Sequence, residues 1–157
     1  GFIYNLQTII MLKPYQCRDE IMQWQFDHLA FNTPSGAPLH TLMSTLLGLE
    51  EGPRPAFPVA GRWLYQGKQA LVHVIERKDH AKPALSHIAF RTDTDASKVL
   101  ARVKASGLSH GISELPDKNL WQIFVQLPGS IMLELVVPAN DDPSMHNDFH
   151  RLQAQIA

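Results

Sequence analysis

The stretch Phe26-Asp27-His28-Leu29-Ala30-Phe31-Asn32-Thr33 decides the fold, because the chain repeats it 59 residues later as Leu85-Ser86-His87-Ile88-Ala89-Phe90-Arg91-Thr92. At this offset a histidine, an alanine, a phenylalanine and a threonine are identical in the two stretches. The same offset superposes Gly48-Leu49 on Gly107-Leu108. The sequence therefore predicts two related halves, each of which begins with a strand that carries a histidine.

Composition restricts the classes of function. The 157 residues contain 14 Lys and Arg against 15 Asp and Glu, with no basic stripe of the kind that binds nucleic acid. A single cysteine, Cys17, cannot form an internal disulfide, which fits a reducing compartment. We find neither a bilayer-spanning apolar run nor a basic signal-peptide start. We expect a cytoplasmic protein that binds a small-molecule substrate and neither nucleic acid nor membrane.

Three regions are predicted along the chain. Residues 1–22 follow no clean period and form an N-terminal extension, which could be an added strand, a partner contact or in part a tag. Residues 23–138 form one domain, with modules at 24–77 and 84–138. Residues 139–157 form a C-terminal tail that is helical between Pro143 and Ile156.

The first half begins with a strand over Trp24 to Phe31. Apolar residues at helical spacing then predict a helix that ends at Gly48 and buries its whole stripe in the core; the stripe is Leu39, Leu42, Met43, Leu46 and Leu47. Proline-rich residues 50–58 indicate a loop or a broken edge strand, and a plausible lid over a site. Strands at 62–66 and 70–77 follow, joined by a hairpin turn.

The second half repeats this order. A strand at 85–92 precedes a helix whose Ala96, Val99, Leu100 and Val103 form an apolar stripe. Strands are predicted at 111–115, 119–127 and 130–137. Each half is thus a strand, a helix and three strands, and the fold class is α+β with eight strands and two helices.

Four polar residues occupy the first and last strands of the two halves: His28, His73, His87 and Glu134. By strand alternation, Leu29 faces the helix of the first half, which leaves His28 for a shared cleft. A carboxylate in a strand that is apolar on both sides is costly unless it is paired or bound to a cation.

Two imidazoles and a carboxylate would suit a divalent Zn, Mn, Fe, Ni or Co ion. His73 could complete the coordination or act as a base beside it. A lone histidine in a half-buried strand is, by contrast, often a hydrogen-bonded structural residue. His146 and His150, four residues apart in the tail, could bind metal in principle but suit a solvated helix face better.

The paired His-Leu/Ile-Ala-Phe motifs and the stretch from Trp121 to Leu135 (WQIFVQLPGSIMLEL) resemble the vicinal oxygen chelate superfamily. This superfamily includes glyoxalase I, methylmalonyl-CoA epimerase, extradiol dioxygenases and bleomycin resistance proteins. The resemblance covers Trp24 to Pro138. It implies two tandem β-α-β-β-β modules that form a cupped eight-stranded mixed sheet around a cleft, and often a homodimer.

The resemblance also implies a site. The superfamily takes its metal ligands from the first and last strands of each half, which correspond to His28, His73, His87 and Glu134. His73 stands where glyoxalase I has a second glutamate and epimerases have a glutamine. The implied function is that of a glyoxalase-type lyase or isomerase, which acts through a metal-chelated enolate or alkoxide.

Several roles follow from this expected chemistry. The candidates for the proton-transferring base are Glu134 and His73, and the residues expected to contact or orient the substrate are Tyr65, Trp63, Gln122 and Phe124. One alternative is a non-haem Fe(II) extradiol-type dioxygenase. Another is a metal-free binding protein of the bleomycin-resistance type, in which Trp63, Phe124 and Trp121 line the cleft.

Overall fold

The computed structural model describes residues 22–115, 118–129 and 131–141. The predicted N-terminal extension, Cys17 and the tail helix with His146 and His150 lie outside the described residues. In the described part of the chain, each half has the predicted order of a strand, a helix and three strands.

The first module comprises β1 (Gln25–Thr33), α2 (Gly36–Leu47), β2 (Glu50–Gly52), β3 (Gly61–Gln66) and β4 (Gln69–Glu76). The second comprises β5 (Ala84–Arg91), α3 (Ala96–Ala105), β6 (His110–Glu114), β7 (Leu120–Gln126) and β8 (Met132–Pro138). The predicted broken edge strand is β2, which is only 3 residues long.

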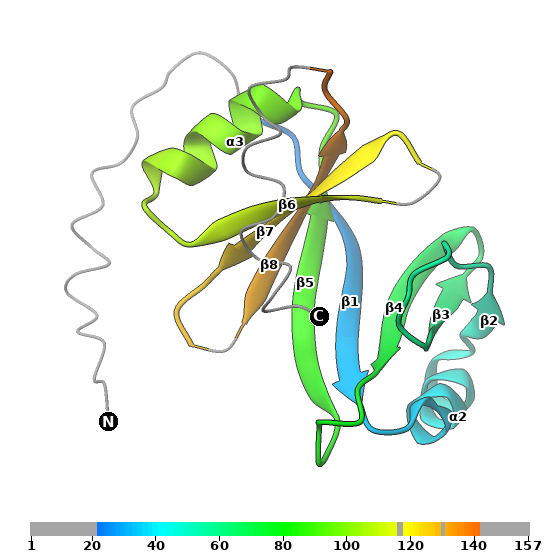
Figure 1. Cartoon of the computed structure of the whole chain (residues 1–157). Coiled ribbons are helices and arrows are strands. Elements are labelled where there is room, and N and C mark those ends of the chain that lie inside the picture. The colour runs from blue at the N-terminus through cyan, green and yellow to red at the C-terminus, as the bar shows by residue number, and fades with distance from the viewer. Residues whose placement is uncertain (1–21, 116–117, 130, 142–157) are drawn as a thin grey trace.

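All eight strands belong to one mixed sheet in the order β2-β3-β4-β1-β5-β8-β7-β6. The first strands of the two modules, β1 and β5, pair antiparallel at the centre, and each pairs on its other side with the last strand of its own module, in parallel. Figure 1 shows β1 and β5 side by side, with β2 to β4 on one flank and β6 to β8 on the other. The predicted α+β fold with an eight-stranded mixed sheet is confirmed.

Each module has its own core between its helix and its strands. In the second module the stripe Ala96, Val99, Leu100 and Val103 is buried as predicted, and it packs with residues of β6, β7 and β8. Asp95 caps this helix, because its side chain accepts a hydrogen bond from the backbone N–H of Ser97 at 2.8 Å.

The core of the first module is smaller, and here the prediction that the whole helical stripe is buried is wrong. Leu39 and Met43 pack against the core, but Leu42, Leu46 and Leu47 are exposed by 53%, 74% and 57%. The apolar stripe that helical spacing identifies on α2 is wider than the surface that strands β3 and β4 can cover. In the described part of the chain, we find no helix with the length and apolarity that crossing a bilayer requires.

Candidate metal centre

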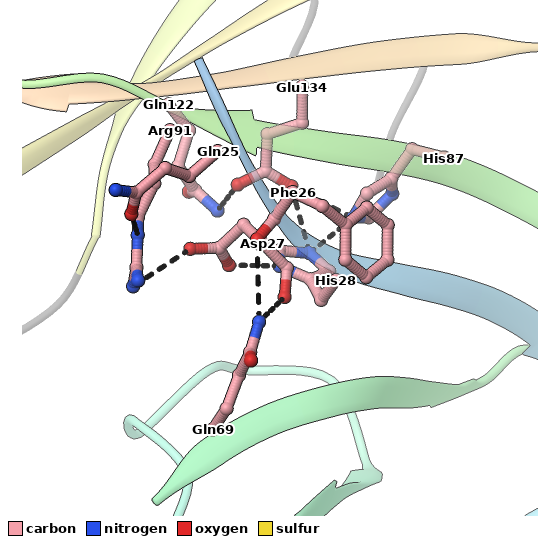
Figure 2. Close-up of polar contacts among 9 residues, drawn as sticks. All are labelled: Gln25, Phe26, Asp27, His28, Gln69, His87, Arg91, Gln122 and Glu134. Atoms are coloured by element: carbon pink, nitrogen blue, oxygen red, sulfur yellow. Dashed lines mark hydrogen bonds and ion pairs between the residues drawn. The ribbon is translucent and has the colours of Figure 1, made fainter. Parts of the chain in front are cut away.

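Three polar side chains from the central strands meet on the sheet face opposite the two cores. His28 lies on β1, His87 on the adjacent β5 and Glu134 on β8 (Figure 2). Strand pairing brings them together, because Ala30 is opposite His87 and Ala89 is opposite Glu134. All three are buried, with exposed fractions of 3%, 7% and 1%.

The donor atoms of these residues form a small triangle, which we call the triad. Nε2 of His28 lies 3.2 Å from Nε2 of His87, and Oε2 of Glu134 lies 3.3 Å from the first and 2.8 Å from the second. Oε2 is buried and, among the described residues, is approached by these two imidazole nitrogens. Two imidazole nitrogens and a carboxylate oxygen therefore converge, with the carboxylate as the counter-charge of the imidazoles.

This arrangement fits a divalent cation. Ligand atoms about 2.1 Å from an ion lie roughly 3.0 Å apart at a right angle and about 3.4 Å apart in a tetrahedron. The three edges of the triad, at 2.8 to 3.3 Å, fall close to this range. In the part of the chain that the structure describes, these are the three residues whose ligand atoms cluster in this way.

Both histidines are held by the residue that precedes them. The pairing of β1 with β5 shifts register at Asp27 and again at Ser86, so each of these residues stands in a β-bulge. Nδ1 of His28 donates to Oδ1 of Asp27 at 2.6 Å, and Nδ1 of His87 lies 3.0 Å from Oγ of Ser86. Both contacts fix the Nδ1 edge and leave Nε2 for the triad.

Glu134 is held from the opposite side. Gln122 on β7 donates from Nε2 to Oε1 of Glu134 at 2.9 Å, and its own Oε1 accepts a hydrogen bond from Ser113 at 3.1 Å. The amide thereby fixes one carboxylate oxygen and leaves Oε2 turned toward the histidines (Figure 2). Gln122, predicted to contact or orient the substrate, contacts the carboxylate of the triad.

His73 lies beside the triad without joining it. Its ring stacks on that of His28, with centroids 3.6 Å apart, and on Trp63 from the other side, at 3.9 Å. The planes are nearly parallel, at 18° and 10°. The ring of His73 thus lies between the indole of Trp63 and the imidazole of His28.

The ionisation of these groups reflects their burial and their neighbours. Burial opposes charge on His28, but the hydrogen bonds to Asp27 and Glu134 outweigh it and raise its pKa to about 9. Burial would raise the pKa of Glu134, but the imidazoles of His87 and His28 hold it well below its usual value. Burial, and then the charge of His28, lower the pKa of His73 to about 2.

The triad opens onto a cavity of about 930 Å³ that lies between the two flanks of the sheet. The predicted residues Trp63, Phe124, Tyr65 and Gln122 all line it. The hydroxyl of Tyr65 donates to the carbonyl of Pro53, so it supports the loop after β2. Trp121 was expected in the cleft of a binding protein, but it is 2% exposed and belongs to the core beneath α3, because it faces the opposite side of β7 from Gln122.

Known proteins match this chain in structure only. No protein-family model and no curated protein matches the sequence. Methylmalonyl-CoA epimerase from Mycobacterium tuberculosis is 16% identical, with a TM-score of 0.53 over 73% of this chain and 88% of that one. A halotolerant catechol dioxygenase is 16% identical, with a TM-score of 0.56 over 76% of this chain and 41% of that one.

A Mn(II)-bound glyoxalase from Novosphingobium aromaticivorans is also 16% identical, with a TM-score of 0.54 over 75% of this chain and 41% of that one. Together with the paired modules, these matches identify the architecture. The chain has the vicinal oxygen chelate fold. The triad lines the cavity between the two modules.

Sequence reasoning missed two residues of this centre. Strict strand alternation places Asp27 and Ser86 on the side opposite their histidines, whereas the bulges let both side chains reach them. The one available signal was that the two residues are equivalent in the 59-residue repeat and that both have side-chain oxygens.

Proposed function

We propose that the protein is a metal-dependent small-molecule enzyme of glyoxalase type, a lyase or isomerase whose substrate presents two neighbouring oxygens. One observation supports this above the others: the buried Oε2 of Glu134 converges with two imidazole nitrogens, at spacings that suit one divalent cation, on the wall of a large cavity. A buried carboxylate is costly unless it is paired with a positive charge, which a divalent cation held by all three groups would supply.

The ligands would be Nε2 of His28, Nε2 of His87 and Oε2 of Glu134. When bound, the ion would act as a Lewis acid that stabilises negative charge on the substrate oxygens. The chain supplies the rest: Asp27 and Ser86 orient the imidazoles, and Gln122 holds the carboxylate. The apolar cavity walls would restrict water around the reacting atoms.

For proton transfer, Glu134 is the stronger of the two candidates. A pKa near 2 makes His73 a poor proton acceptor at neutral pH, and its two-sided stacking suits a positioning role. The imidazoles also hold the pKa of Glu134 well below its usual value, so the preference for Glu134 rests on position: it is ionised and lines the cavity, and its carboxylate is not enclosed between two stacked rings. We propose that it accepts the substrate proton, while Gln122 keeps its second oxygen in place.

A second candidate is a non-haem Fe(II) extradiol-type dioxygenase. The observation in its favour is the donor set, since two histidines and one carboxylate with open positions are typical of Fe(II) oxygenases. The cation would discriminate between the two. Iron with oxygen consumption on catechols supports the dioxygenase, and a redox-inactive ion without oxygen uptake opposes it.

The test begins with metal analysis. Protein purified without chelator is assayed for bound metal, then titrated with Zn²⁺, Mn²⁺, Fe²⁺, Ni²⁺ and Co²⁺, and His87→Ala and Glu134→Ala are treated in parallel. We expect about one ion per chain in the wild type and a large loss in both variants. Equally weak binding in all three proteins would remove the proposal and favour the metal-free binding protein.

Reaction class can then be assigned with hemithioacetals of α-ketoaldehydes, catechols and acyl-CoA esters as substrates. The homodimer and the cytoplasmic location stay predictions. Light scattering after size-exclusion chromatography tests the first, and cell fractionation tests the second.

A further inference from the structure

Arg54 lies in the loop that joins the edge strand β2 to β3, and it lines the same cavity as the triad. Two contacts hold its guanidinium group. Nη2 donates to the carbonyl of Val59 at 2.8 Å, and Cζ lies 5.5 Å from the centroid of the Phe57 ring. The side chain is therefore positioned on the cavity wall rather than extended into bulk solvent.

The bonding capacity of Arg54 is largely unused. A guanidinium group has five N–H donors and carries a positive charge at any physiological pH. Among the described residues it makes one hydrogen bond and no ion pair, and its Nε is buried with no acceptor. A buried donor without an acceptor is costly, so the arrangement favours a ligand that brings a negatively charged acceptor to this position.

A continuous row of flat rings connects Arg54 to the triad. Phe57, beneath the guanidinium, lies 6.2 Å from Trp63, measured between ring centroids. Trp63 stacks on His73, and His73 stacks on His28. A flat, apolar substrate could lie along this row, with one end at the triad and the other at the guanidinium group.

The charge of the cavity limits how anionic such a substrate can be. In the metal-free protein its wall carries five cationic and four acidic side chains, namely Arg54, Lys68, Arg91, Lys118 and the His28 imidazolium against Asp27, Asp93, Glu114 and Glu134. This balance suits one negative charge better than a polyanion such as a CoA ester. The planar fork of arginine matches a carboxylate in particular.

We propose that Arg54 is a specificity-determining residue that binds a carboxylate of the substrate. The substrate class is then a flat, apolar carboxylic acid that places two neighbouring oxygens at the triad. This inference rests on the proposed function, which it deepens by naming the substrate class.

The competing role for Arg54 is structural. Its bond to Val59, together with the bond from Tyr65 to Pro53, ties the loop down at two points. Loss of such a tie would weaken the binding of every ligand that contacts the loop. It would not distinguish a carboxylic acid from its methyl ester, because the two are identical apart from the charged group.

The experiment therefore compares matched acids and esters on the zinc-loaded protein by titration calorimetry. The probes are 3,4-dihydroxybenzoate, 3,4-dihydroxyphenylacetate and 3,4-dihydroxyphenylpropionate, each with its methyl ester. The three acids place the carboxylate at three different distances from the catechol ring. The variants are Arg54→Met, which removes the charge, and Arg54→Lys, which keeps the charge without the fork. Arg62→Met is the matched control, because Arg62 pairs with Glu51 at 3.0 Å and does not line the cavity.

For at least one of the three chain lengths, we expect the acid to bind the wild type at least tenfold more tightly than its methyl ester. This preference should fall below twofold in Arg54→Met, shrink in Arg54→Lys and persist in Arg62→Met. Equal binding of acid and ester at all three chain lengths overturns the inference. A preference for the acid that survives in Arg54→Met, or a failure of all six probes to bind, also overturns it.

The same titrations on chelator-treated protein test the proposed function separately. Ester affinities that do not depend on zinc would remove the metal-dependent function, while the acid preference would still decide the role of Arg54.

Discussion

Replacing Asp27 by alanine should weaken divalent metal binding, and the size of the loss should depend on pH. Oδ1 of Asp27 accepts the Nδ1 hydrogen of His28 at 2.6 Å, as a charged partner of a metal-ligating imidazole. Loss of such a partner costs about 10- to 100-fold in metal affinity. A charged hydrogen bond of about 1.5–3 kcal/mol corresponds to roughly the same factor.

Proton competition modifies this loss. In the metal-free wild type the pKa of His28 is raised to about 9. At pH 7, protonation of His28 therefore lowers the apparent metal affinity roughly a hundredfold. The hydrogen bond to Asp27 is the largest single cause of the elevation, followed by the hydrogen bond and charge of Glu134. Removing it lowers the pKa of His28 and so relieves the competition. The difference between wild type and variant should therefore be largest near pH 9 and clearly smaller at pH 7.

The assay is zinc binding at pH 7, 8 and 9, with free zinc set by a chelator buffer. Asp93→Ala is the matched control, since Asp93 lines the same cavity but is not part of the network drawn in Figure 2. Ser86→Ala should lose less than Asp27→Ala and show a weaker dependence on pH, because Ser86 is a neutral partner. Affinity that is unchanged at pH 9, or a difference that grows toward pH 7, would refute the reasoning.

Three further predictions follow from burial and charge. In chelator-treated protein, thermal melts from pH 5 to 9 should lose stability above about pH 6.5, because the folded state retains the His28 proton up to about pH 9 while the unfolded state releases it earlier. Glu134→Gln should abolish zinc binding and lower the free energy of unfolding of the metal-free protein by about 3–5 kcal/mol in urea titrations, since a buried imidazolium loses its counter-charge. Leu46→Gln should change that free energy by less than about 0.5 kcal/mol, because Leu46 is 74% exposed. Val99→Ala, at 1% exposure, should lower it by about 2 kcal/mol, and comparable effects of the two substitutions would contradict the burial.

The repeat and the strand periodicity predicted the order of strands and helices in each half, and the resemblance to a known superfamily predicted that the strands form one mixed sheet. Alternation placed His28 and His87 on the cleft side, and the cost of burying Glu134 indicated a cation site before any distances were known. Periodicity could not predict the bulges at Asp27 and Ser86, because a bulge breaks the alternation on which the reasoning depends. The helix α2 shows a second limit, since apolar spacing identifies a face but not whether strands cover it.

The two modules share the same strand geometry but carry different side chains at equivalent positions. Ala30 pairs with His73 and Ala89 pairs with Glu134 in equivalent parallel ladders, so His73 and Glu134 occupy corresponding positions although they stand 61 residues apart rather than 59. One position holds a stacked imidazole of very low pKa, and the other holds the carboxylate that completes the triad.

The residues behind the ligands differ in the same way. Asp27 brings a charge to His28, whereas Ser86 brings a neutral hydroxyl to His87. A duplicated frame can bring two histidines together on adjacent strands, but two identical modules would have given a symmetric site. Under the proposed function, the departures from the repeat would leave one side of the cleft, that of His73, Trp63 and the Arg54 loop, for the substrate. We therefore expect substitutions on the His73 side to alter substrate preference more than metal affinity, and substitution of Glu134 to do the reverse.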